Sequence, residues 1–124
     1  MTKSKPTRGQ AEAEFTQAII RFEKEYLGRG PVDARTYFIK DMILVRLQGV
    51  LTPAELKLAE TKDGRSLIKE TRRLLFESSR QFLEEMVQQV TGALLISLHT
   101  DMSSRTGERV ILLTVDRDLE KVFK

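Results

Sequence analysis

The spacing of apolar side chains predicts a helix near the start of the chain, over residues 9–27. Its apolar residues recur at the interval of one buried helix face, and the charged residues fall largely elsewhere. The apolar set is Phe15, Ala18, Ile19, Phe22 and Tyr26. Gly28 follows, and glycine ends helices because it adopts the left-handed conformation without strain.

Two more helices are predicted in the middle of the chain. Thr52-Pro53-Ala54-Glu55 combines an N-cap, a proline suited to the first helical position and the acid of a capping box. This short helix ends near Gly64, and a long helix over residues 66–91 follows, stopped by Gly92. Its wide apolar stripe predicts cover on more than one side. The stripe contains Leu67, Ile68, Leu74, Leu75, Phe82, Leu83, Met86, Val87 and Val90.

Four stretches have the composition and length of strands. They are residues 36–39, 42–47, 93–98 and 109–115. Lys40-Asp41 is the predicted turn of the first pair, and Gly107, with a positive φ, lies in the polar connection of the second. Asp116 is predicted to cap a last short helix over residues 117–123.

The predicted order is α-β-β-α-α-β-β-α, which is an α+β fold. Two strand pairs combine into a four-stranded antiparallel sheet packed with helices on one face. Both faces of the strands contain apolar residues, so part of the second face also needs cover. A homodimer supplies that cover with one kind of chain.

Length and composition fit one globular domain over residues 10–124, preceded by a disordered basic tail, residues 1–9. Of 124 residues, 40% are hydrophobic and 31% charged, and cysteine is absent. No apolar run reaches the length of a membrane helix, and the first residues lack the apolar core of a signal peptide. These features predict a cytoplasmic protein.

The positive charge lies in the tail. The chain has a net charge of +3, and Lys3, Lys5 and Arg8 supply three positive charges in a segment without acids. The remaining residues therefore sum to zero. A nucleic-acid-binding domain needs a basic surface of its own, so binding to nucleic acid is disfavoured.

His99 is the only histidine, and it stands two residues before Asp101 near a strand end. The pair fits three interpretations. The first is a general base oriented by a carboxylate, the second a ligand or partner contact, and the third a structural hydrogen bond. A metal site would need further ligands, and none is predicted.

Arginines supply the remaining candidates for anion or partner binding. Arg29 and Arg35 flank a glycine-proline turn between a helix and a strand, whereas phosphate loops run from a strand into a helix. The two side chains are still suited to binding an anion. Arg46 and Arg109 lie within apolar strands and need a carboxylate.

The two acids that the sequence offers these strand arginines are Asp101 and Glu108. Arg72 and Arg73 are interpreted as solvated charge. No catalytic motif is visible, so we expect neither an enzyme nor a bound cofactor.

Several segments in this order resemble the MpsC family, a component of a sodium-translocating system that generates membrane potential. The segments are residues 21–31, 42–55, 97–101 and 106–110. The resemblance covers about residues 10–120. The resemblance implies a soluble accessory or regulatory protein, because the chain has no membrane segment to serve as the ion conduit. The membrane partners of the family resemble subunits of respiratory complexes and of inorganic-carbon uptake systems.

The leading hypothesis is therefore a non-enzymatic, homodimeric accessory protein of a membrane sodium or bicarbonate transport system, placed in the cytoplasm or at the membrane surface. It acts by binding transport subunits or a ligand. The first alternative is a small-anion sensor that uses Arg29, Arg35, His99 and Asp101. A nucleic-acid-binding regulator ranks lower.

Overall fold

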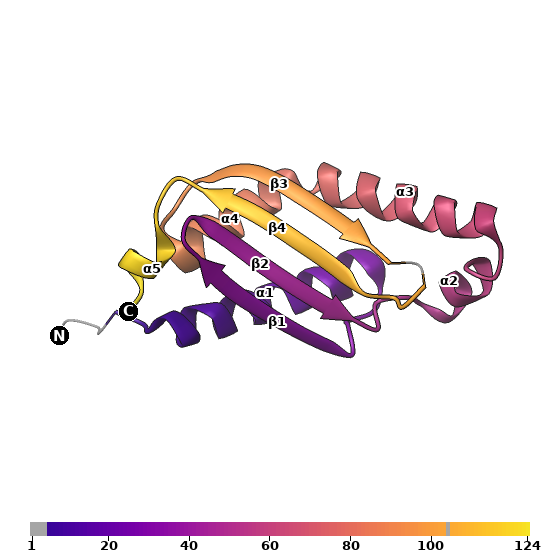
Figure 1. The fold of residues 1–124 in the computed structure, drawn as a ribbon, viewed down its shortest axis with the longest axis horizontal. Coiled ribbons are helices and arrows are strands. Elements are labelled where there is room, and N and C mark those ends of the chain that lie inside the picture. The colour runs from indigo at the N-terminus through magenta and orange to yellow at the C-terminus, as the bar shows by residue number, and fades with distance from the viewer. Residues whose placement is uncertain (1–4, 104) are drawn as a thin grey trace.

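The computed structural model describes residues 5–103 and 105–124, and it confirms the α+β class and the antiparallel sheet (Figure 1). The elements are α1 (Arg8–Leu27), β1 (Asp33–Ile39), β2 (Met42–Gln48), α2 (Pro53–Leu58), α3 (Lys62–Ser78), α4 (Arg80–Thr91), β3 (Leu95–Met102), β4 (Arg109–Val115) and α5 (Leu119–Val122). Residues 1–4 of the predicted tail lie outside the described residues. The end of that tail is ordered, because Thr7 caps α1 in a capping box with Gln10.

The sheet has the order β1-β2-β4-β3, with every neighbouring pair antiparallel. Each hairpin is local, and β2 and β4 join the two hairpins at the centre. Two glycines have the predicted positive φ, 77° at Gly28, which ends α1, and 74° at Gly107 in the β3–β4 connection. A positive φ at both positions favours glycine, which has no Cβ to clash.

The helices α1, α3 and α4 pack on one face of the sheet. Figure 1 shows α1 and α4 behind the strands, whereas α3 extends past the edge of the sheet beside β3. The core lies in this layer, since the strand residues that point toward the helices are buried. Phe15 and Ile19 of α1, Phe76 of α3 and Leu83 of α4 are each at most 1% exposed. Alternation along the strands places every second residue on the other side.

That other side, here called the open face, has no helix packed on it in the described part of the chain. Its residues are partly or fully exposed. They are Arg35, Tyr37, Ile39, Met42, Leu44, Arg46, Val110, Leu112, Thr114, Ser97, His99 and Asp101.

The single long helix predicted over residues 66–91 is wrong, because the structure has two helices broken at Ser79. The backbone of Ser79 leaves the helical region, with φ −100° and ψ 16°. The Ser78 and Ser79 hydroxyls both donate to the carbonyl of Leu75, at 2.9 Å each. Serine hydroxyls that bond to the preceding turn compete with the helix, which is the physical reason for the break.

The predicted stripe of this segment is also wrong in part. Leu67 and Leu74 are 56% and 53% exposed, and the buried face of α3 runs instead through Gly64, Ile68, Arg72 and Phe76. Gly64 lies on the buried face because it is packed tightly, and a Cβ there would lie 1.8 Å from the Leu58 carbonyl oxygen. The first turn of α3 packs directly on the end of α2.

The last helix begins later than predicted. Asp118, not Asp116, caps α5, and its side chain accepts a hydrogen bond from the backbone of Glu120. Asp116 accepts from the Leu94 backbone N–H at 2.8 Å and thereby fixes the turn into β3. The aspartate predicted as a cap therefore holds a loop.

Candidate functional site

A buried arginine lies at the start of β4, in the layer between sheet and helices. Arg109 is 2% exposed. Its Nη1 donates to Glu23 Oε1 of α1 at 3.2 Å, and its Nε donates to Thr100 Oγ1 of β3 at 3.1 Å. The guanidinium carbon also lies 4.7 Å from the centre of the Phe76 ring, within the range of a cation–π contact. One side chain thus ties α1, α3, β3 and β4 together.

A second buried arginine comes from α3. Arg72 is 4% exposed and forms a bidentate ion pair with Glu55 of α2. Its Nε lies 2.7 Å from Glu55 Oε2, and its Nη2 lies 2.5 Å from Glu55 Oε1. Its Nη2 also donates to the Val50 carbonyl at 2.9 Å. The buried Nη1 lies 3.9 Å from Glu23 Oε2 and has no hydrogen-bond partner among the residues that the structure describes. The prediction that Arg72 is solvated is therefore wrong.

Glu23 lies between the two arginines and is 1% exposed. Burial raises the pKa of its carboxyl, and the positive charges of Arg109 and Arg72 offset only part of that rise. Burial likewise lowers the pKa of Arg109, against the opposing effect of Glu23. An arginine still keeps its charge in proteins, so the cluster contains two fixed cations.

Glu55 belongs to the same cluster but is partly exposed. Burial raises the pKa of its carboxyl, yet the hydrogen bonds from Arg72 and from the Thr52 backbone outweigh that effect, and the net pKa is lowered. The capping box predicted at Thr52 and Glu55 is confirmed, with Glu55 Oε1 3.0 Å from the Thr52 backbone nitrogen. The same carboxylate thus caps α2 and neutralises Arg72.

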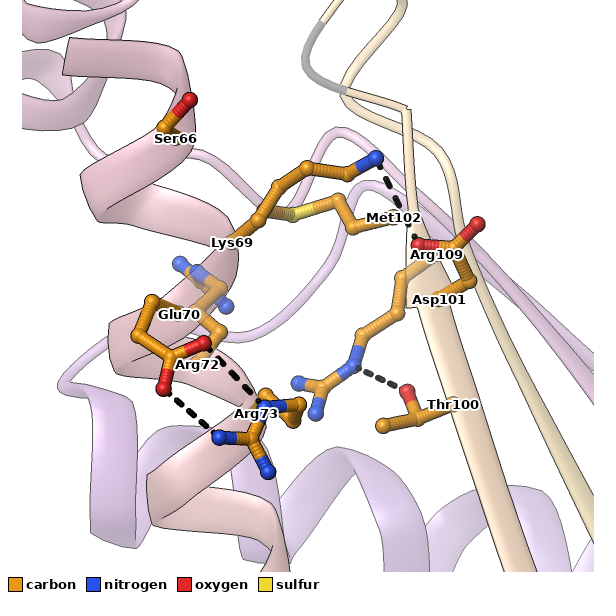
Figure 2. A pocket seen from close by; sticks show the side chains of 9 residues that line it. All are labelled: Ser66, Lys69, Glu70, Arg72, Arg73, Thr100, Asp101, Met102 and Arg109. Carbon is orange, nitrogen blue, oxygen red and sulfur yellow. Dashed lines mark hydrogen bonds and ion pairs between the residues drawn. The ribbon is translucent and has the colours of Figure 1, made fainter. Parts of the chain in front are cut away.

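A pocket of about 290 Å³ opens between α3 and the β3–β4 hairpin, next to this cluster (Figure 2). Figure 2 shows Arg109 reaching from β4 toward α3, between Arg73 and Thr100. Four of the lining side chains are basic and two are acidic. The pocket is lined by Ser66, Lys69, Glu70, Arg72, Arg73, Thr100, Asp101, Met102 and Arg109.

The ion pairs at the mouth of the pocket are exposed. Lys69 Nζ lies 3.5 Å from Asp101, whose side chain is 85% exposed, and Arg73 lies 2.6 Å from Glu70. Exposed pairs of this kind contribute about 0–1 kcal/mol, so a ligand can exchange for their carboxylates. The pocket therefore offers guanidinium, ammonium and hydroxyl donors, which are suited to a small anion.

The structure brings two of the five sequence-predicted residues to this pocket, Asp101 and Arg109. Arg29 lies elsewhere and donates to the Leu51 carbonyl at 2.9 Å, which fixes the loop after β2. Arg35 lies on β1, at the opposite edge of the sheet from Asp101. At about 4.8 Å per strand, three strand spacings separate the two by about 14 Å.

His99 is exposed on the open face, and its Nε2 lies 3.2 Å from the Ser97 hydroxyl. Both strand arginines, Arg46 and Arg109, pair with a carboxylate, as predicted. Arg46 pairs with the predicted Glu108 at 2.6 Å, whereas Arg109 pairs with Glu23, which sequence reasoning did not select. In the described residues, no three His, Cys, Asp or Glu side chains are grouped to hold a metal ion.

The fold and the site define a small α+β protein with a charged pocket set over a buried ion-pair cluster. Residues 7–117 match the family described as Na+-translocating membrane potential-generating system (MpsC), and the chain belongs to that family. Across the ranges that the structure describes, no helix has both the length and the apolar character to cross a membrane.

Two relatives come from Bacillus subtilis (strain 168). The chain is 45% identical over 117 residues to the uncharacterized protein YbcI, covering 94% of each chain. It is 30% identical over 110 residues to the uncharacterized protein YrhF, covering 87% of this chain and 89% of the relative. No solved structure matches the chain.

Proposed function

We propose that this protein is a non-enzymatic, cytoplasmic accessory or regulatory component of a membrane sodium or bicarbonate transport system. It works as a homodimer at the membrane surface and acts by binding. The family description supports the link to a sodium-translocating system. The chemistry of the pocket supports binding, because arginine and lysine hold anions firmly but arginine does not exchange protons.

The observation that carries this proposal is the position of the pocket over the buried ion-pair cluster. Arg72 and Arg109 line the pocket and also contact Glu55 and Glu23, which come from α2 and α1. An anion that binds there changes the charge felt by side chains from several elements at once. Occupancy of the pocket is thereby linked to the packing of the helices on the sheet.

A small-anion-sensing domain is the second candidate function, and the same pocket favours it. This pocket differs from the anion site that the sequence predicted. Its basic residues include Lys69, Arg72 and Arg73, whereas the predicted site used Arg29, Arg35 and His99. A nucleic-acid-binding regulator has less support, because its phosphate contacts require clustered lysines and arginines without nearby acids.

Titration of the protein with small anions tests the pocket. Bicarbonate and inorganic phosphate, compared with chloride at equal ionic strength, are expected to release or absorb heat in calorimetry. Arg73→Ala and Lys69→Ala are each expected to weaken binding about tenfold, because each removes a charged donor. Lys57→Ala, an exposed lysine of α2 outside the pocket, is the matched control and should bind as the unaltered protein does.

Two results would count against ligand binding at this pocket. One is the absence of heat with either oxyanion, and the other is an equal loss of binding in the Lys57→Ala control.

Capture from native membranes tests the transport role. Immobilised protein is expected to retain subunits of a sodium or bicarbonate transport system, identified by mass spectrometry, and beads without protein should not. The Arg73→Ala variant shows whether capture requires the pocket. Recovery of only nucleic acid or of unrelated soluble proteins would reject the transport role, whatever the anion titration shows.

A further inference from the structure

The open face of the sheet is apolar at its centre and charged at one end. The strand register arranges its side chains in three rows across β1, β2, β4 and β3. The first row is Arg35, Arg46, Val110 and Asp101; the second is Tyr37, Leu44, Leu112 and His99; the third is Ile39, Met42, Thr114 and Ser97.

This composition is unusual for a sheet face in contact with water. An antiparallel sheet that has one face on the core normally presents polar residues on the other. Here Tyr37 and Ile39 are 42% and 40% exposed, and Leu44 and Leu112 stand half-buried beside them. A contiguous apolar patch of this kind marks an interaction surface.

The charges of the first row indicate which partner fits. Arg35 stands at one edge of the row and Asp101 at the other, so the row is positive at one end and negative at the other. Arg46 between them is already paired with Glu108, at 2.6 Å. Asp101 forms an exposed ion pair with Lys69 at 3.5 Å, its one ion pair within the described ranges. A face with opposite charges at opposite edges is complementary to a second copy of itself.

We infer that two copies pack open face against open face about a twofold axis that runs parallel to the strands, between β2 and β4. This axis lays β1 of one copy against β3 of the other and keeps each row opposite the same row. Arg35 then meets Asp101 of the partner subunit, and Leu44 meets Leu112 of the partner subunit. Aligned sheets pack in this manner about 10 Å apart.

A twofold axis across the strands is the other way to pair the two faces, and it is excluded by charge. It would set the first row against the third, so that Arg35 would face Ile39 of the partner subunit. Asp101 would face Ser97 of the partner subunit. Both charges would lose water without gaining an opposite charge, which is unfavourable. The axis parallel to the strands satisfies both charges twice, once at each edge.

This arrangement rests on the homodimer of the proposed function; it shares Asp101 with the pocket but requires neither anion binding nor the transport role. It also unites residues that one copy keeps apart. Arg35 lies across the sheet from His99 and Asp101 within a single copy, and the twofold axis brings it opposite Asp101 of the partner subunit, with His99 of the partner subunit in the next row. Three of the five residues selected from the sequence, Arg35, His99 and Asp101, thereby lie at the two edges of the dimer interface, whereas Arg29 and Arg109 lie outside it.

Sedimentation velocity over a concentration series tests the surface. The unaltered protein is expected to form dimers, and Leu44→Glu and Tyr37→Glu are each expected to raise the dimer dissociation constant about a hundredfold, because each places a charge in the apolar centre. Tyr37 is an exposed position, so this second variant folds even if Leu44→Glu does not. Leu67→Glu, exposed on α3, is the matched control and should leave the constant unchanged.

A charge exchange tests the axis. Arg35→Asp and Asp101→Arg are each expected to raise the dissociation constant about tenfold or more, since each sets like charges together at both edges. The double variant Arg35→Asp/Asp101→Arg should restore most of the affinity. If the double variant loses as much dimer affinity as the two single variants combined, the proposed axis is overturned. If the unaltered protein is a monomer at all concentrations, the dimer is overturned. A dimer disrupted by Leu67→Glu and not by Tyr37→Glu assigns the interface to the helices and overturns the surface.

Anion titration of the Tyr37→Glu variant separates this inference from the binding function. Because Tyr37 does not line the pocket, loss of the dimer with unchanged anion binding in this variant supports the interface and leaves the pocket intact. An unaltered protein that binds anions as a monomer overturns the interface alone.

Discussion

Replacing Arg72 with methionine is expected to lower the free energy of unfolding by about 3–5 kcal/mol, the usual effect of removing one partner of a buried ion pair. Arg72 is 4% exposed and gives Glu55 two hydrogen bonds and the Val50 carbonyl another. Methionine fills a similar volume but leaves both acceptors without their donor. Urea denaturation followed by circular dichroism measures the change.

Arg73→Met is the matched control, one residue further along α3. Arg73 also forms ion pairs, with Glu70 and Glu77, but its side chain is 45% exposed. Water replaces the lost partner there, so the loss of stability should be much smaller. Equal losses in the two variants would show that Arg72 does not derive its effect from burial of the cluster.

Replacing Arg109 with methionine is expected to cost about 3–5 kcal/mol near pH 7, and distinctly less near pH 5. The variant leaves the Glu23 carboxylate buried with only Arg72 nearby, at 3.9 Å and without a hydrogen bond. The pKa of Glu23, already raised by burial, then rises further in the variant. The folded state therefore takes up a proton at a higher pH than the unfolded state does.

The sign of the pH dependence follows from that shift. Above the folded-state pKa of Glu23, the buried charge opposes folding in full. As the pH falls through that pKa, protonation removes the charge and stability returns relative to the unaltered protein. Urea unfolding at the two pH values measures this recovery. Glu23→Gln in the Arg109→Met background is the control, and it should abolish the recovery. A loss that does not vary with pH would show that Glu23 is not the group left unpaired.

Much of the fold was predictable because its signals are local. The capping box at Thr52 and Glu55 and the glycine at position 28 act within a few residues, and both were found at the expected places. The strands were found from short apolar and β-branched runs, except that β3 runs from Leu95 to Met102 and so includes residues 99–102, beyond the predicted strand 93–98. Antiparallel hairpins then follow, since each strand pair has a short connection.

The break at Ser79 and the rotation of α3 were not predictable in this way. Leu67 and Leu74 have the spacing of a buried stripe, yet they face water. The true face carries Arg72 midway between Ile68 and Phe76, four residues from each. The four-residue spacing of Ile68, Arg72 and Phe76 was the one signal of this face in the sequence. A search for apolar residues alone misses it, because its middle residue is an arginine. Its tertiary partners, the Glu55 carboxylate and the Val50 carbonyl, make its burial favourable.

The need of Arg109 for a carboxylate was predicted, but the identity of that carboxylate was not. Arg109 was selected because an arginine within an apolar strand needs a carboxylate, and this reasoning holds. Its partner Glu23 lies 86 residues away on a different element, a distance at which sequence spacing carries no information. Pairing across the fold depends on how α1 lies on the sheet, and no pattern along α1 specifies that.

The sheet order also bears on the sequence of events in folding. The hairpins β1–β2 and β3–β4 close over short connections, whereas β2 and β4 meet only after the whole helical segment between them has been bridged. Distant contacts form more slowly because closing a longer loop costs more chain entropy. We therefore expect the docking of two preformed hairpins to limit the folding rate. Glu23 and Arg109 come from opposite halves of the chain, so their ion pair forms after docking and acts mainly by slowing the separation of the halves.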